Sequence, residues 1–233
     1  MVHEFLDALG EDRTRLLTHV SADGAEWIHG PFRVRAPQAV ICLDPFHVVA
    51  WAVEAVEKVR RRLAAELHRD GRSDQASTIK HSRWALIRDY RKQTPEQRGR
   101  LAQIAVTNKP LYRAYLIKEQ LREAFKVKGD PGKALLVGVI AWCARSRLPE
   151  LVTLGATLGH YRDLIWATFD HGLSNVASEA TNTHLRVLTR TAYGFHTPEA
   201  LISRAMLTRG GLCPELPGRV TLRTSGSSGR AAA

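Results

Sequence analysis

The sequence predicts a mainly helical protein with a small parallel α/β portion near its N-terminus. Two short apolar runs, Leu16–Val20 and Ala39–Leu43, are bounded by turn or capping residues, which is typical of buried strands. The segment between them, from about Ala25 to Ala36, is long enough for a crossover helix, so the two strands should be parallel. After Pro45, apolar residues recur at three- and four-residue spacing, which indicates helices.

An aspartate follows each predicted strand: Asp23 in S-A-D-G and Asp44 in D-P-F-H-V. Ligands of open α/β sheets lie beyond the carboxyl ends of the strands, so both carboxylates should stand at one edge, where they suggest a metal site. His47 could orient a carboxylate or a phosphate there. Each residue also has a structural interpretation, because Asp before Gly is common in turns, Asp44 before Pro45 can cap a helix, and a lone His often packs.

The rest of the chain is expected to be helix and loop. The first twenty residues favour a helix or a helix pair broken near Gly10, and the polar stretch 68–82 favours a loop. On the helix after Pro110 we expect Lys118, Glu119, Arg122 and Glu123 to face water. The long helices are expected from Pro45 into the arginine run 60–62, from Thr94 with a capping box, after Pro110, from Lys133 to Arg147, and from Pro149 to about Phe169.

Composition restricts the partners and the compartment. The chain has 34 Lys and Arg against 23 Asp and Glu, a net charge of +11, which favours a polyanion such as nucleic acid, although a solvated basic surface has the same composition. Cys42, Cys143 and Cys213 are isolated, so neither a zinc ribbon nor a disulfide framework is indicated. The sequence shows no signal peptide and no apolar run of membrane-spanning length, so we expect a cytoplasmic protein without a membrane partner.

A further pattern lies far downstream. The run L-S-N-x-x-x-E-x-x-N starts at Leu173 and contains Glu179; Arg186, Arg190 and a Y-G-F run at 193–195 follow it. Together with S-A-D-G and D-P-F-H-V in this order, it resembles the DDE transposases of the ISL-three type of bacterial insertion sequences. The resemblance extends from about residue 3 to residue 212.

The resemblance implies a partial RNase H-like catalytic domain interrupted by a helical insertion. Asp23 and Glu179 would then be catalytic metal ligands for Mg²⁺ or Mn²⁺, and Asp44 would lie close to the metals. Without the resemblance, Glu179 would be an ordinary surface glutamate. The implied parts are a partial βαβ unit at 1–48, the insertion at 49–170 and a C-terminal catalytic helix region at 171–212, before a tail at 213–233 whose composition predicts disorder.

Four arginines are the predicted DNA-binding residues. Helical spacing places Arg186 and Arg190 on one face with Glu179, where they could meet phosphates, although a solvated polar face is the alternative. Arg60 and Arg61 belong to the second basic group. The implied partners are DNA, in the form of transposon ends, and a second copy of the chain or a full-length transposase.

Two departures from the family's pattern affect the expected function. Val176 and Ala180 replace its glycines near the glutamate, and its first catalytic aspartate lies upstream of anything present here, since Asp7 and Asp12 fall in a helical pattern. We therefore expect a truncated transposase, inactive alone, whose ancestral reaction is metal-dependent DNA cleavage and strand transfer. The alternative is a non-catalytic basic helical protein that binds DNA or interferes with a full-length transposase.

Overall fold

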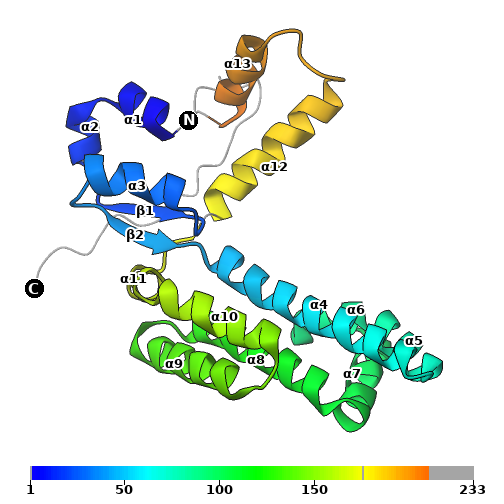
Figure 1. The fold of residues 1–233 in the computed structure, drawn as a ribbon. Coiled ribbons are helices and arrows are strands. Elements are labelled where there is room, and N and C mark those ends of the chain that lie inside the picture. Colours follow the sequence, from blue (N-terminus) through cyan, green and yellow to red (C-terminus); the bar gives the residue numbers. More distant parts are fainter. Residues whose placement is uncertain (1, 175, 210–233) are drawn as a thin grey trace, which may run out of the picture. The chain divides into compact units, whose positions relative to one another are not determined.

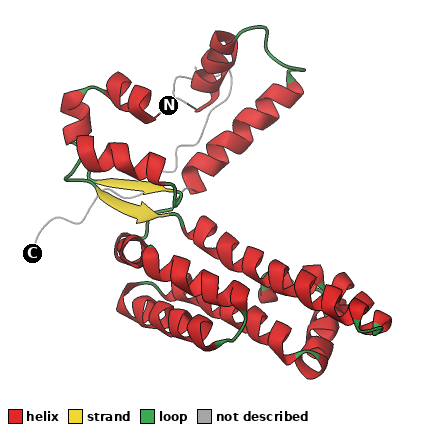
Figure 2. Cartoon of the chain, viewed as in Figure 1, coloured by secondary structure: helices red, strands yellow, loops and turns green. Residues whose placement is uncertain are grey.

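The computed structural model describes residues 2–174 and 176–209, and it divides the chain into two compact units, Met1–Asn175 and Val176–Ala233 (Figure 1). The described part is mainly helical with one small parallel sheet, which confirms the predicted fold class at that level (Figure 2). The finer division at residues 48 and 170 stays a prediction, and the predicted disordered tail at 213–233 lies outside the described residues.

The helices and strands of the first unit follow one another as α1 (Val2–Leu9), α2 (Glu11–Arg15), β1 (His19–Ala22), α3 (Glu26–Arg35), β2 (Val40–Leu43), α4 (Pro45–Arg69), α5 (Ser73–His81), α6 (Arg83–Ile87), the 3₁₀ turn η1 (Tyr90–Lys92), α7 (Pro95–Thr107), α8 (Lys109–Val127), α9 (Gly129–Arg145), α10 (Pro149–His160) and α11 (Arg162–His171). The described helices of the second unit are α12 (Val176–Thr191) and α13 (Pro198–Arg209). None of the described helices is both long and apolar enough to cross a membrane.

The two strands are parallel, as predicted, and α3 makes the crossover between them. Their register pairs His19 with Val40 and Ala22 with Leu43. The first strand starts later than its apolar run suggested, because Leu16 closes α2 and is 77% exposed. The register therefore ends both strands directly before an aspartate.

A small apolar cluster supports the sheet. Leu6 from α1, Phe32 and Ala36 at the end of α3, and Ile41 from β2 are all buried together. The predicted break near Gly10 separates α1 from α2, and the φ of 79° at Gly10 is a conformation that glycine adopts at little cost.

The larger core lies among the long helices. α4 packs against α5, α8 and α10, α9 packs against α8 and α10, and α11 packs against β2 (Figure 1). Val48, Val56 and Val59 of α4 are fully buried, so the three- and four-residue spacing did identify the inward face of this helix. The predicted capping box is present, since the N–H of Gln97 donates to Thr94 Oγ1 and the N–H of Thr94 donates to Gln97 Oε1.

Two predictions of secondary structure were wrong. The stretch 68–82, predicted as a loop, carries the end of α4 and the whole of α5, because Ala76 and Ile79 are buried against neighbouring helices and so stabilise a polar helix. The single helix expected from Pro149 is two helices, α10 and α11, which meet at Tyr161.

Lys118 was predicted to face water but is fully buried. Its ammonium donates to the carbonyl oxygen of Leu86, lies 2.6 Å from a carboxylate oxygen of Glu119 and stands over the ring of Tyr115. These contacts explain why a charge is tolerated inside the helical core. Burial nevertheless lowers the pKa of Lys118 to about 8, although Glu119 acts in the opposite direction.

Candidate metal-binding site

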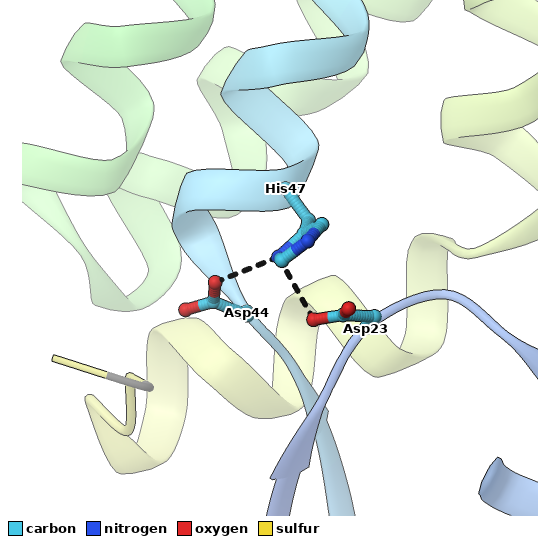
Figure 3. A group of neighbouring side chains, drawn as sticks. All are labelled: Asp23, Asp44 and His47. Atoms are coloured by element: carbon cyan, nitrogen blue, oxygen red, sulfur yellow. Dashed lines mark hydrogen bonds and ion pairs between the residues drawn. The ribbon is translucent and has the colours of Figure 1, made fainter. Parts of the chain in front are cut away.

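The ends of β1 and β2 bring two carboxylates to one edge of the sheet. Ala22 and Leu43 are paired in the register, and the backbone N–H of Asp44 donates to the carbonyl oxygen of Ala22 at 3.0 Å. Asp23 and Asp44 are the next residues along each strand. The sequence prediction that these aspartates meet at the carboxyl end of the strands is therefore realised in the structure (Figure 3).

His47 completes the cluster from the first turn of α4. Its Nδ1 lies 2.9 Å from Asp23 Oδ1 and 3.0 Å from Asp44 Oδ2, and the three ligand atoms lie within 4.8 Å of one another (Figure 3). Asp44 occupies the position before α4, but its side chain makes no capping hydrogen bond. Its carboxylate is directed at His47 instead, so the capping interpretation alone does not account for Asp44.

The cluster is closed on one side and open on the other. The side chain of Asp44 is 2% exposed, whereas those of Asp23 and His47 are 43% and 37% exposed. A buried carboxylate is costly unless a cation or hydrogen-bond donors compensate it. An ion held by the buried Asp44 and the partly exposed Asp23 and His47 would keep coordination positions open for water or substrate.

The atoms present fit a small divalent cation. Two ligands at right angles around an ion with bonds of about 2.1 Å lie about 3 Å apart. The distances from His47 Nδ1 to the two carboxylate oxygens, 2.9 and 3.0 Å, match that spacing and are also those of N–H···O hydrogen bonds between the residues. Carboxylate ligands suit Mg²⁺ and Mn²⁺, and an imidazole ligand is better tolerated by Mn²⁺.

Contacts from the region of α11 hold both strand ends. Tyr161 donates its hydroxyl to the carbonyl oxygen of Gly24 at 2.7 Å, and Thr168 donates to the carbonyl oxygen of Leu43 at 2.6 Å. The ring of Trp51 covers Gly24 so closely that a Cβ there would lie 2.8 Å from it. The sequence carried no local signal for Tyr161 or Thr168, because each contacts a residue more than a hundred positions away.

The residues predicted in the C-terminal part lie on a helix. Glu179 belongs to α12, and Arg186 and Arg190 line a shallow hollow on that helix with Asn182 and Thr189. The side chain of Glu179 lies outside the described part of the structure. Its proximity to Asp23 therefore stays a prediction.

The two arginines predicted on α4 differ in accessibility. Arg60 is buried, forms a two-pronged ion pair with Glu57 at 2.8 Å and donates to the carbonyl oxygen of Lys80. Arg61 is exposed, with Nε 3.4 Å from the carbonyl oxygen of Glu57. Of the two, Arg61 is the one whose guanidinium is free to reach a phosphate.

Comparisons with known proteins identify the family of the chain. A family model described as Transposase, of the ISL-three DDE type, matches residues 1–205. The chain is 44% identical, over 92% of its length, to the transposase for insertion sequence element IS1557 from two strains of Mycobacterium tuberculosis, covering 53% of those proteins. It is 28% identical, over 84% of its length, to the transposase for IS1001 from Bordetella parapertussis, covering 48% of it. No solved structure matches significantly.

The chain therefore spans about half the length of the curated relatives it matches. The family match covers most of the chain and includes the strand ends, α4 and α12. The order of the motifs, the two carboxylates at the strand ends and the family match all lead to one assignment. This chain belongs to the ISL-three family of DDE transposases.

Proposed function

We propose that this chain supplies metal-binding and DNA-binding residues for DNA cleavage and strand transfer in transposition, within an RNase H-like domain interrupted by helices α4 to α11. The observation that carries the proposal is the convergence of Asp23, Asp44 and His47 at the ends of two parallel strands. Family membership supports the same reaction class.

The residues have separate roles in this proposal. Asp23, exposed at the end of β1, and Glu179 on α12 would hold Mg²⁺ or Mn²⁺, which would neutralise charge on the scissile phosphate and activate the attacking hydroxyl. Asp44 is buried and would fix His47 or act as a ligand itself. His47 Nδ1 is directed between the carboxylates, where it would hold both in one orientation.

DNA is the proposed substrate. The net charge of +11 supports binding to a polyanion, and the exposed Arg61 together with Arg186 and Arg190 would contact phosphates. We propose the ends of an insertion element as the specific DNA. A second copy of the chain or a longer transposase is the proposed protein partner.

A chimeric transposase tests this function. The matched part of the Mycobacterium tuberculosis relative would be replaced by this chain, and excision of a marked element would be measured in cells, with the unmodified chimera as the reference. Asp23→Asn and Glu179→Gln should abolish excision, because each keeps the side-chain size and removes the ligand charge. Asp163→Asn, an exposed aspartate of α11, is the matched control and should retain it.

Asp44→Asn distinguishes two roles in the same assay. A complete loss would identify Asp44 as a metal ligand, and a mild loss as a residue that positions His47. Excision that survives both Asp23→Asn and Glu179→Gln would contradict the proposal and leave the non-catalytic DNA-binding alternative. We also predict that the 233-residue chain alone neither cleaves nor joins element ends in Mg²⁺ or Mn²⁺, which a gel assay with purified protein would check.

A further inference from the structure

A groove of about 800 Å³ runs along α4 and is bounded by α6, the η1 region and α8. These helices pack together within the first unit (Figure 1). The groove starts at Pro45 and Phe46, directly after Asp44, and follows one face of α4 through Val49 and Val53. Its apolar floor therefore begins beside the candidate metal-binding site.

The rim of the groove is basic. Six of its lining residues are Arg or Lys, and three are acidic. The acidic residues are already engaged: Glu54 pairs with Lys58, Glu57 pairs with Arg60 and Arg83, and Asp89 accepts the backbone N–H of Arg91. The neighbouring Arg60 lowers the pKa of Glu57 and the backbone N–H of Arg91 lowers that of Asp89, so both carboxyls are charged and locally compensated.

Three of the basic side chains have no ion pair within the described residues: Arg61 on α4, and Arg88 and Lys92 on the opposite side of the groove. Arg88 and Lys92 are both exposed, and neither forms an ion pair with a residue that the structure describes. By contrast, Arg83 pairs with Glu57, Arg122 with Glu119 and Lys126 with Glu123. The unpaired charge of the groove is therefore positive, with Arg88 and Lys92 at its α6–η1 side and Arg61 on α4.

Phe46 gives the groove an aromatic surface. It is 63% exposed although it lies in the first turn of a long helix, and its ring meets that of His47 edge-on at 5.9 Å. Because this exposed ring continues the apolar lining formed by Pro45, Val49 and Val53, the groove offers a contiguous apolar and aromatic surface to a ligand. Phe46 directly precedes His47 of the candidate metal-binding cluster in the sequence.

We propose that this groove binds an unpaired DNA strand, with a base stacked on Phe46 and phosphates held by Arg88 and Lys92. Single-stranded DNA is bound where a positive groove follows the backbone and an aromatic face stacks a base, and both features are present here. In a duplex the base faces are covered by their neighbours, so the ring of Phe46 selects an unstacked base. This inference depends on the proposed function in one respect only. The bound strand would lead toward the carboxylates of the candidate metal-binding site.

Fluorescence anisotropy with a labelled single-stranded oligonucleotide tests the proposal on the full chain. The measurements are made in EDTA, which removes divalent cations, so that metal binding does not contribute to the affinity. Phe46→Ala should weaken binding about tenfold, as the loss of one stacked base predicts. The double variant Arg88→Glu with Lys92→Glu should weaken binding further. It should also make the affinity depend less steeply on salt concentration, because two phosphate contacts are lost.

Matched variants elsewhere on the surface set the controls. Phe5→Ala removes another exposed phenylalanine, 54% exposed, from α1, and Arg145→Glu reverses an exposed charge on α9, outside the groove. Both should leave the affinity within about twofold. Circular dichroism would verify that every variant is folded.

Two results would overturn the proposal. One is that the groove variants bind the oligonucleotide no more weakly than their controls. The other is that a duplex of the same sequence binds as tightly as the single strand and is equally weakened by Phe46→Ala. Excision that survives Asp23→Asn and Glu179→Gln, with the groove variants still weakening binding in EDTA, would instead count against the metal site alone, so the two proposals fail separately.

Discussion

At the residue scale, the position of Asp23 depends on a hydroxyl from a distant part of the chain. Tyr161 binds the carbonyl oxygen of Gly24, the residue after Asp23, and its ring lies 5.3 Å from that of Trp51, which covers the same glycine. When this hydrogen bond is removed, the carbonyl oxygen of Gly24 can bond only to water, and the turn after Asp23 becomes less ordered. We therefore propose that Tyr161 positions the strand end that carries Asp23, and with it the candidate metal-binding site.

Tyr161→Phe should lower the free energy of unfolding by about 1 kcal/mol, the usual contribution of such a bond, and should weaken Mn²⁺ binding as well. Urea denaturation and a Mn²⁺ titration would measure the two effects. Tyr112→Phe is the matched control, since Tyr112 is a half-buried tyrosine packed against the same core. If Tyr161→Phe destabilised the chain but left Mn²⁺ binding unchanged, its role would be structural only.

Lys118 predicts a pH dependence of stability. Its pKa is about 8 in the folded chain and near 10.5 in the unfolded chain, so between these values the unfolded chain binds more protons. Stability contributed by this group therefore rises as the pH increases from about 8 to about 10.5. In Lys118→Met this rise should disappear, although the variant loses the bond to Leu86 at every pH.

Urea denaturation of the original chain and of Lys118→Met at pH 8 and pH 10 would measure how the free energy of unfolding changes with pH in each. The contribution of Lys118 is the difference between the two changes, because the other titrating groups contribute equally to both chains. Equal changes in the two chains would contradict the assignment of a lowered pKa to Lys118.

At the element scale, the packing of α10 on α9 depends on a missing side chain. A Cβ at Gly155 would lie 2.8 Å from Cys143 Cβ and 3.4 Å from the carbonyl oxygen of Ile140. Gly99 is also inside a helix, α7, but a Cβ there would meet nothing within 4 Å. Substitution of Gly155 therefore tests the packing between two helices, whereas substitution of Gly99 tests helix propensity alone.

Gly155→Ala should destabilise the chain by about 1–3 kcal/mol, because it overpacks the contact with α9. Gly99→Ala should stabilise it by about 0.5–1 kcal/mol, because alanine is the better helix former in open space. Thermal unfolding of the two variants would test both signs. A stabilising Gly155→Ala would show that α10 and α9 can separate without cost.

The elements also show why some features could be predicted from the sequence. β1, α3, β2 and the start of α4 carry local signals, namely apolar runs, capping residues and an aspartate at each strand end, and these fixed the position of Asp23 and Asp44. α5 has few apolar residues and depends on its contacts with α4. The burial of Lys118 and the contact of Tyr161 with Gly24 arise only from the tertiary fold, so no local pattern could predict them.

At the scale of the whole molecule, the basic charge falls in both units. The first unit carries Arg61, Arg88 and Lys92 on or near the groove of α4, and the second carries Arg186 and Arg190 on one face of α12. Each set suits phosphate contacts by itself. We therefore propose that each of the two units contributes phosphate contacts to DNA binding.

We propose above all that the cluster of Asp23, Asp44 and His47 takes part in holding a divalent cation, and a Mn²⁺ titration of the 233-residue chain, followed by electron paramagnetic resonance, is the sharpest test. Saturable Mn²⁺ binding is expected, strongly weakened by Asp23→Asn and weakened by Asp44→Asn to the degree that Asp44 is itself a ligand, while the exposed control Asp163→Asn should bind like the original chain. Mn²⁺ binding that is absent from the original chain, or unchanged in both cluster variants, would contradict it.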